Sequence, residues 1–79
     1  MTDKPTPDRT VDAKGLLCPM PMVKLAKAMK ELEPKQVLLL EATDPGSIPD
    51  VAAWSRNTGN PLLAHETTGK VMRFWVEKA

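Results

Sequence analysis

The sequence has very few of the side chains on which small-protein chemistry usually depends: its 79 residues include one cysteine, one histidine and no tyrosine. A single cysteine cannot form an internal disulfide, which excludes the disulfide-stabilised class of small secreted domains. One cysteine and one histidine are too few ligands for an ordinary zinc site, so we expect no metal and no other cofactor. Dithiol redox chemistry is excluded because Pro21 stands where a C-x-x-C motif has its second cysteine.

An excess of charge of one sign and a long hydrophobic run are also missing. The 11 Lys and Arg residues nearly balance the 10 Asp and Glu residues, so no overall basic field is available to bind nucleic acid. No apolar run approaches the roughly 18 residues of a membrane span, and the N-terminus lacks the apolar core of a signal peptide. We therefore expect a cytoplasmic protein with a reduced cysteine, and by default a monomer that makes transient contacts.

The length allows one small domain. Residues 1–8 are polar and contain two prolines, so they are expected to form a disordered N-terminal tail. A single domain is expected over residues 9–79. Within it, the pattern predicts strands over residues 9–13, 36–42, 61–67 and 71–78, and helices over residues 19–32 and 47–58.

The apolar periodicity assigns one inward face to each helix. The predicted inward residues of the first helix are Met22, Leu25, Ala26 and Met29. Those of the second helix are Ile48, Val51, Trp54 and Thr58. Ser47 is expected to be the N-cap of the second helix, with Asp50 in its capping box and Gly59 at its end.

The order β-α-β-α-β-β predicts an α+β fold class. Two helices cannot cover both faces of a four-stranded sheet, so we expect a two-layer sandwich with both helices on one face of a mixed sheet. The strand-helix-strand passages fit right-handed parallel crossovers, and residues 67–70 fit the turn of an antiparallel hairpin. The order of the strands in the sheet stays open at this point.

The most reactive side chain stands in the motif Cys18-Pro19-Met20-Pro21, at the expected start of the first helix. With Cys18 as N-cap, Pro21 occupies the third helical position and removes one of the N–H groups that would bond to the cap. The helix dipole favours a thiolate there, and Gly15 begins a flexible approach to it. The alternative is an inert, buried cysteine, which is common for free thiols. A lone activated thiolate can accept a group and pass it on, and sulfur carried as a persulfide is one such cargo.

Other side chains have less specific interpretations. Lys14, Lys24, Lys27 and Lys30 form either a docking surface for an acidic partner or the solvated face of the helix, with Lys24 the better docking candidate. Asp44 and Ser47 are expected at the same end of the sheet as Cys18, in ordinary turn and cap roles. Arg73 and Trp75 are either an exposed interface pair or a cover over the helix-free face of the sheet. His65 lies too far along the chain to form a Cys-His hydrolase site.

The sequence resembles the TusA/SirA-type sulfur-carrier family over about residues 9–78. The matching segments are Asp12 to Gly15, Cys18 to Pro21, Thr43 to Pro45, Asp50, Trp54, Thr58-Gly59 and the final hairpin. One departure is Pro34-Lys35-Gln36, because family members commonly place a glycine before the second strand.

The resemblance implies that Cys18 is the catalytic residue and holds sulfur as a persulfide. Pro19, Pro21 and Gly15 would shape the site, and Met20 and Lys24 are candidates for partner docking. The implied partners are a sulfur-donor enzyme, of cysteine desulfurase or rhodanese type, and a downstream acceptor protein. The pathway stays open among tRNA thiolation, molybdenum-cofactor maturation and sulfur metabolism.

Whether such a carrier counts as an enzyme or as a co-substrate is also left open. Two other classes of function remain at this point. One is a non-catalytic regulatory or complex-forming module with a structural Cys18, and the other is a thiol redox sensor.

Overall fold

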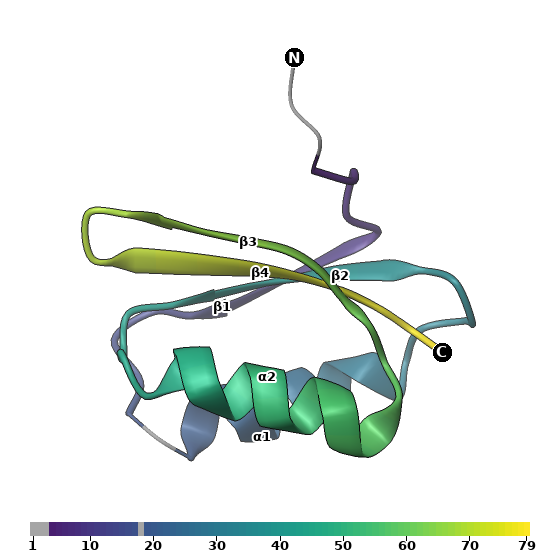
Figure 1. The fold of residues 1–79 in the computed structure, drawn as a ribbon, viewed down its shortest axis with the longest axis horizontal. Coiled ribbons are helices and arrows are strands. Elements are labelled where there is room, and N and C mark those ends of the chain that lie inside the picture. Colours follow the sequence, from purple (N-terminus) through teal and green to yellow (C-terminus); the bar gives the residue numbers. More distant parts are fainter. Residues whose placement is uncertain (1–3, 18) are drawn as a thin grey trace.

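The computed structural model covers residues 1–79 and describes residues 4–17 and 19–79. Four strands and two helices follow the predicted order (Figure 1). The strands are β1 (Arg9–Ala13), β2 (Val37–Ala42), β3 (Leu62–Thr68) and β4 (Val71–Glu77), and the helices are α1 (Met20–Met29) and α2 (Ser47–Thr58). No helix in these two described stretches is long and apolar enough to cross a membrane.

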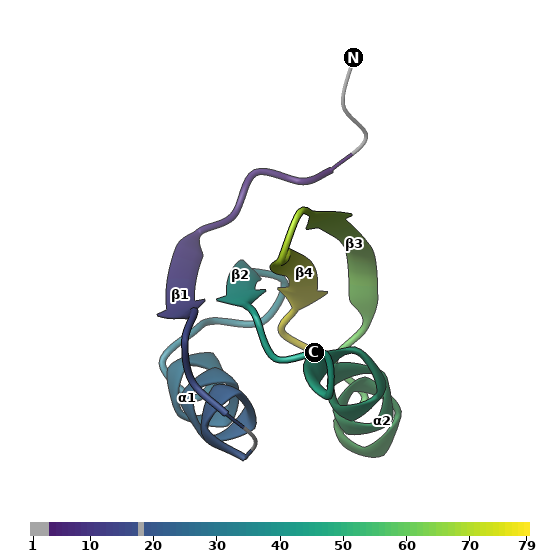
Figure 2. The ribbon, with the colours of Figure 1, turned by 90° about the vertical axis from the view of Figure 1, so that its left-hand side faces the viewer.

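The strands form one mixed sheet in the order β1-β2-β4-β3. β1 and β2 are parallel, whereas β4 runs antiparallel to both of its neighbours. Both helices lie on the same face of this sheet, so the predicted two-layer α+β fold is confirmed (Figure 2). β4 lies between β2 and β3 because the crossover through α2 leaves room for the returning strand of the hairpin.

The core lies between the sheet and the helices. Its largest fully buried side chains come from every layer: Phe74 and Val76 on β4, Leu38 and Leu40 on β2, Leu25 on α1 and Val51 on α2. Met72, Phe74 and Val76 share the face of β4 that the sequence assigns to the interior, and each is at most 5% exposed. Strand alternation therefore places the β4 side chains as predicted.

The predicted inward face of α1 is correct in its centre. Leu25 and Met29 are buried and Met22 and Ala26 half-buried, while Pro21 and Ala28 are buried in addition. The α-helix ends at Met29, three residues before the predicted end. After Met29 the N–H groups of Glu31 and Leu32 bond to carbonyls three residues back, which tightens the last turn out of α geometry.

The predicted start and inward face of α2 need correction. Gly46, not Ser47, is the N-cap, and Ser47 is the first helical residue and is buried. Ile48 is 45% exposed and Thr58 is also exposed, whereas Val51 is buried and Trp54 packs against the core. The reason is the tight turn in which Ser47 N–H bonds to the Asp44 carbonyl at 2.9 Å, because it starts the helix with Ser47 facing the sheet. The end at Gly59 is as predicted, with φ of 78°.

The segment before β1 crosses the sheet face that has no helices (Figure 2). Residues 4–8 contain no helix or strand, and residues 1–3 of the expected tail lie outside the described residues. Lys4 Nζ lies 5.8 Å from the centre of the Trp75 ring and 3.0 Å from Glu66. At the other end of the segment, Asp8 exchanges two hydrogen bonds of 2.8 Å with the backbone of Val37.

Candidate functional site

The connections that matter for function meet at one end of the molecule. β1 and β2 end there at Ala13 and Ala42, α1 and α2 begin there, and the β3–β4 hairpin turns there (Figure 1). This arrangement follows from the parallel pairing of β1 with β2, because the carboxyl ends of parallel strands lie at the same edge. Cys18 belongs to the β1–α1 connection but lies outside the described residues, so the site is described from its neighbours.

The approach to Cys18, which the sequence predicts to be flexible, is held by hydrogen bonds at its first residues. Lys14 N–H donates to Asp12 Oδ1 at 2.9 Å, and Gly15 N–H donates to Thr43 Oγ1 at 2.9 Å. Leu16 N–H donates to the Ala13 carbonyl at 3.2 Å. Gly15 has φ of 81°, so glycine is needed here for its left-handed backbone. These bonds fasten the residues before Cys18 to the ends of β1 and β2.

The start of α1 is shifted by one residue from the prediction. Pro19 is the N-cap and makes no side-chain cap, so Cys18 precedes the cap and Pro21 is the second helical residue. Neither proline has a backbone N–H, and Met20 N–H donates to the Leu17 carbonyl at 2.9 Å. Pro21 is also fully buried, so it fixes the helix start against the core.

Apolar side chains around the cysteine position are exposed. Leu17 is 73% exposed, Met20 47% and Val23 50%. Pro19, between them, is exposed as well. We call Leu17, Met20 and Val23 the apolar collar. Large apolar side chains gathered in this way on a small protein are typical of a surface that contacts another protein.

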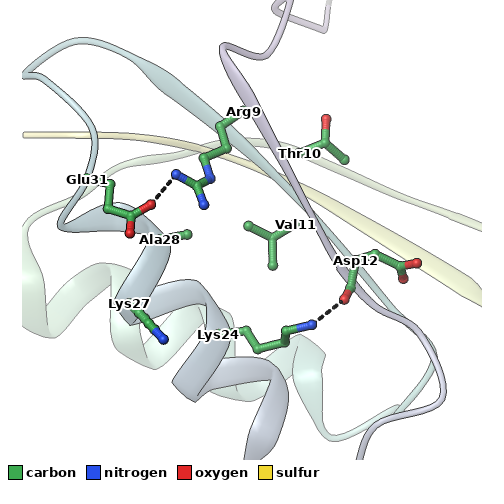
Figure 3. A pocket seen from close by; sticks show the side chains of 8 residues that line it. All are labelled: Arg9, Thr10, Val11, Asp12, Lys24, Lys27, Ala28 and Glu31. Carbon is green, nitrogen blue, oxygen red and sulfur yellow. Dashed lines mark hydrogen bonds and ion pairs between the residues drawn. The ribbon is translucent and has the colours of Figure 1, made fainter.

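The lysines of α1 lie away from the core, as predicted. Lys24 reaches across to β1, where its Nζ donates to the backbone carbonyl of Asp12 at 3.0 Å (Figure 3). Lys27 on the same helix and Lys30, its C-cap, are exposed. Lys24 therefore connects α1 to the strand that leads to Cys18, besides being available at the surface.

A row of charged side chains crosses the sheet next to this site. Asp12, Glu41, Arg73 and Glu66 are register partners on β1, β2, β4 and β3, in that order. Arg73 lies 3.0 Å from Glu41 and 3.5 Å from Glu66, and Lys14 lies 3.2 Å from both Asp12 and Glu41. Lys14 thus separates two carboxylates that stand side by side on neighbouring strands.

This row shifts the protonation of its members. The Lys14 backbone N–H and ammonium lower the pKa of Asp12. The pKa of Lys14 is raised by its hydrogen bonds to Asp12 and then to Glu41. The pKa of Glu41 is lowered first by Lys14 and then by Arg73. All three shifts favour the charged forms, so the row holds Lys14, next to Gly15, in place.

The remaining predicted residues have structural positions. Asp44 accepts from Gly46 N–H at 3.3 Å in the turn before α2. Ser47 is only 2% exposed, and its Oγ has no hydrogen-bond partner among the described residues. Trp75 is 6% exposed and covers the helix-free face, so it is not an exposed interface residue. His65 is an exposed residue of β3.

Sequence reasoning missed the residues that hold the approach loop. The Asp12 side chain accepts a hydrogen bond from Lys14 N–H, two residues later, and so forms a local turn. The sequence signal of this turn is an acidic residue shortly before a glycine. The roles of Thr43 and Glu41 had no local signal, because both act across strands that are far apart in the sequence.

Fold and site together define a small two-layer α+β protein with one cysteine at the start of its first helix. The solved structure of the SirA-like protein from Desulfitobacterium hafniense has this fold, with a TM-score of 0.77 over 87% of this chain and 95% of that chain. The sequence identity of the two is 24%, so this likeness concerns the fold alone.

The family follows from sequence comparison. Residues 9–78 match the family described as Sulfurtransferase TusA, and the chain belongs to this family. The putative sulfur carrier protein YrkI of Bacillus subtilis is 48% identical over 71 residues, which cover 90% of this chain and 95% of YrkI. The sulfur carrier protein TusA of Allochromatium vinosum is 38% identical over 72 residues, which cover 91% of this chain and 95% of that protein. The family resemblance seen in the sequence is thereby confirmed.

Proposed function

We propose that this protein is a sulfur carrier that holds sulfane sulfur as a persulfide on Cys18 and relays it between two partner proteins. The observation that carries the proposal is the position of the sequence's one cysteine, directly before the N-cap of α1, in a chain of the sulfurtransferase family. A thiol at a helix start is favoured as the thiolate, which is the nucleophile in sulfur transfer.

Loading is an attack of the Cys18 thiolate on the outer sulfur of a donor persulfide. The new bond joins this sulfur to the Cys18 sulfur, while the donor's S–S bond breaks and its electron pair leaves on the donor thiolate. Unloading repeats the step, with an acceptor thiolate attacking the outer sulfur that Cys18 carries. Each transfer is redox-neutral, so it needs no external oxidant or reductant.

The described residues on both sides of the cysteine support this role. Pro19 and Pro21 have no N–H, and Met20 N–H donates to the Leu17 carbonyl, so few backbone N–H groups are available at the helix start to hold the sulfur in a cap. The bonds of Lys14 and Gly15 fix the chain just before the site. The site therefore has a rigid base, which reduces the entropy lost when a partner docks.

The proposed partners are a sulfur-donor enzyme, of cysteine desulfurase or rhodanese type, and a downstream acceptor protein. The apolar collar of Leu17, Met20 and Val23 offers them a contact surface, and Lys24 adds a positive charge at its side. A transient complex suits such a surface, because both donor and acceptor must use it in turn. A reducing compartment such as the cytoplasm suits a carrier that must stay a free thiol between transfers.

The test is an intact-mass measurement after loading. Reduced protein is incubated with a cysteine desulfurase and cysteine, or with a rhodanese and thiosulfate. We expect one added sulfur atom, which dithiothreitol removes and which Cys18→Ser never acquires. Val23→Ser, in the collar but outside the motif, serves as a control that keeps the thiol and slows loading only through docking.

The proposal fails if the folded wild type gains no sulfur from either donor. In that case Cys18 is a structural residue of an interaction module. An oxygen adduct or a glutathione mixed disulfide without persulfide would overturn the proposal in favour of a redox sensor.

A further inference from the structure

β1 is an edge strand with an open side. In the sheet order β1-β2-β4-β3, the two edges are β1 and β3. β3 has a register shift between Leu62 and Ala64, and such an irregularity blunts an edge against further pairing. β1 keeps an unbroken register from Arg9 to Ala13. It is therefore the edge better suited to take another strand.

A groove runs along this open edge, between β1 and α1. Its volume is about 320 Å³. Figure 3 shows the side chains that line it. Val11 and Ala28 form its apolar floor and are only 8% and 5% exposed. The ion pair of Arg9 with Glu31 crosses one part of the groove, and the bond from Lys24 to Asp12 crosses another (Figure 3).

The bond from Lys24 identifies a backbone acceptor on this edge. Lys24 Nζ lies 3.0 Å from the backbone carbonyl oxygen of Asp12, so this oxygen is accessible to a donor from outside the sheet. A side-chain ammonium that caps an edge carbonyl can be replaced by the N–H of an added strand. The displaced ammonium is then free to meet an anionic side chain.

The charges of the groove favour an acidic occupant. Arg9 is paired with Glu31, and Asp12 is paired with Lys14. Lys24 and Lys27, in contrast, make no close ion pair among the described residues, although the charge of Lys24 also acts on Asp12. Two lysines beside the groove are thus available to a carboxylate of an occupant. A glutamate side chain lying over Val11 and Ala28 would cover the apolar floor with its methylene groups and reach these lysines with its carboxylate.

We propose that the groove between β1 and α1 binds an extended, acidic peptide segment of a partner protein, which pairs with β1 as a fifth strand. The segment has glutamates at alternate positions facing Lys24 and Lys27. This surface borders the apolar collar at Lys24 but uses none of the apolar side chains of the collar, and it needs no reaction at Cys18, so it goes beyond the sulfur-carrier function. Such binding would allow a partner to hold the carrier through β1 while Cys18 leaves one partner active site and enters another.

The test uses the peptide acetyl-Thr-Glu-Val-Glu-Thr-amide and its glutamine analogue, titrated into isotope-labelled protein of residues 1–79 and followed by NMR. We expect shift changes along β1 and at Lys24, Lys27 and Ala28, and interstrand contacts from the peptide backbone to Thr10 and Asp12. Replacing both glutamates by glutamine is expected to weaken binding about fivefold, as for the loss of two weak surface ion pairs.

Two variants, one in α1 and one at its C-cap, make a matched pair, because they introduce the same charge change at lysines three residues apart. Lys27→Glu, beside the groove, is expected to weaken binding about fivefold, whereas Lys30→Glu, outside the groove, is expected to change it by less than about twofold. Cys18→Ser is expected to bind like wild type, which separates this inference from the persulfide proposal.

The inference is overturned if the peptide causes no shifts at millimolar concentration, if the shifts lie on β3 or on the collar, or if the glutamine analogue binds equally well. Concentration-dependent shifts on β1 in the absence of peptide would assign the edge to a second copy of the chain and would also overturn it.

Discussion

At the scale of single residues, backbone conformation explains two positions that the side chains do not. Gly15 and Lys35 both have left-handed φ values, of 81° and 78°. At Gly15 the sequence supplies the residue that this conformation favours. At Lys35, in the turn between α1 and β2, the sequence supplies a residue with a β-carbon, which this conformation disfavours. Its N–H donates to the Lys78 carbonyl at 2.8 Å and so holds the turn. The resemblance to the family leads one to expect a glycine in this turn.

Lys35→Gly is therefore expected to stabilise the protein. The variant removes left-handed backbone strain of about 1–2 kcal/mol from the folded state. Glycine also raises the entropy of the unfolded chain, which lowers the stability by about 0.5–1 kcal/mol. The net increase in the free energy of unfolding is therefore about 0.5–1 kcal/mol. Urea denaturation measures the change. Lys35→Ala keeps the β-carbon and removes the same charge, so it should show no such gain. An equal stabilisation in both variants would point to charge and contradict the backbone explanation.

The role of each residue around Cys18 depends on which of them is the N-cap of α1, and the motif alone does not decide this. The motif is compatible with Cys18 as N-cap, yet the helix uses Pro19 for that position. The predicted effect of Pro21 on a cap at Cys18 therefore does not apply, and what remains is that neither Pro19 nor Pro21 has an N–H at the helix start. Pro21 gains a second role, since it is fully buried against the core.

At the scale of secondary-structure elements, ion pairs connect neighbouring strands of the sheet. Glu41 on β2 contacts Lys14 beyond β1 and Arg73 on β4, and its side chain is 18% exposed. It is the only member of the row of charged side chains that contacts both cations described in that row. Removing its charge should therefore loosen the approach loop and the middle of the sheet together.

Glu41→Gln is expected to lower the free energy of unfolding at neutral pH by about 1 kcal/mol, the size of a partly screened ion-pair network. Folding lowers the pKa of Glu41, so its contribution is fully present above its ordinary value of 4.5 and is lost as the pH falls through the lowered value. The difference between wild type and variant should thus be constant near neutrality and shrink below pH 4.5.

Urea denaturation at a series of pH values checks this. Glu33→Gln is the control, because it removes an exposed carboxylate that makes no ion pair among the described residues. A wild-type advantage over Glu41→Gln that persists unchanged in acid would show that Glu41 acts through packing and not through its charge.

At the scale of the whole molecule, the two faces of the sheet are covered by different means. Both helices cover one face, while residues 4–8 cross the other (Figure 2). Trp75 points to this second face and is nevertheless 6% exposed, with the Lys4 ammonium 5.8 Å from its ring centre. The N-terminal segment thus covers part of a surface that two helices cannot reach.

Removal of residues 1–7 is expected to expose Trp75 and to cost about 1 kcal/mol of stability, through lost apolar burial and the lost cation–π contact. Asp8 stays in the shortened chain, so its bonds to Val37 are retained. Tryptophan emission should shift to longer wavelength when the truncation is made in a Trp54→Phe background, where Trp75 is the remaining tryptophan. In a Trp75→Phe background the same truncation should leave the emission unchanged, and a shift there would contradict the assignment.

Most elements of this fold could be predicted from local sequence pattern. The errors lie at helix ends, where hydrogen bonds of the folded chain fix the first or last residue of the helix. The Lys-Gly and Thr-Gly turns, the alternation of β4 and the glycine end of α2 are properties of a few neighbouring residues. Ile48 and Ser47 show the limit: hydrophobicity favours Ile48 as the inward residue, but the turn from Asp44 rotates Ser47 inward. The end of α1 likewise depends on i→i−3 bonds that sequence periodicity does not distinguish from α-helical ones.

The sequence by itself determined the order of elements, the two-layer class, the family and the position of the one cysteine, because these depend on residue types and on their spacing along the chain. Only the tertiary structure decided which strand lies between which, since strand order depends on how the crossover and the hairpin pack together. It also decided that Thr43, Glu41 and Lys14 hold the approach to Cys18, and that β1 is an edge strand of the sheet. The contacts of Thr43 and Glu41 join segments about 30 residues apart in the sequence, where only long-range packing brings the partners together.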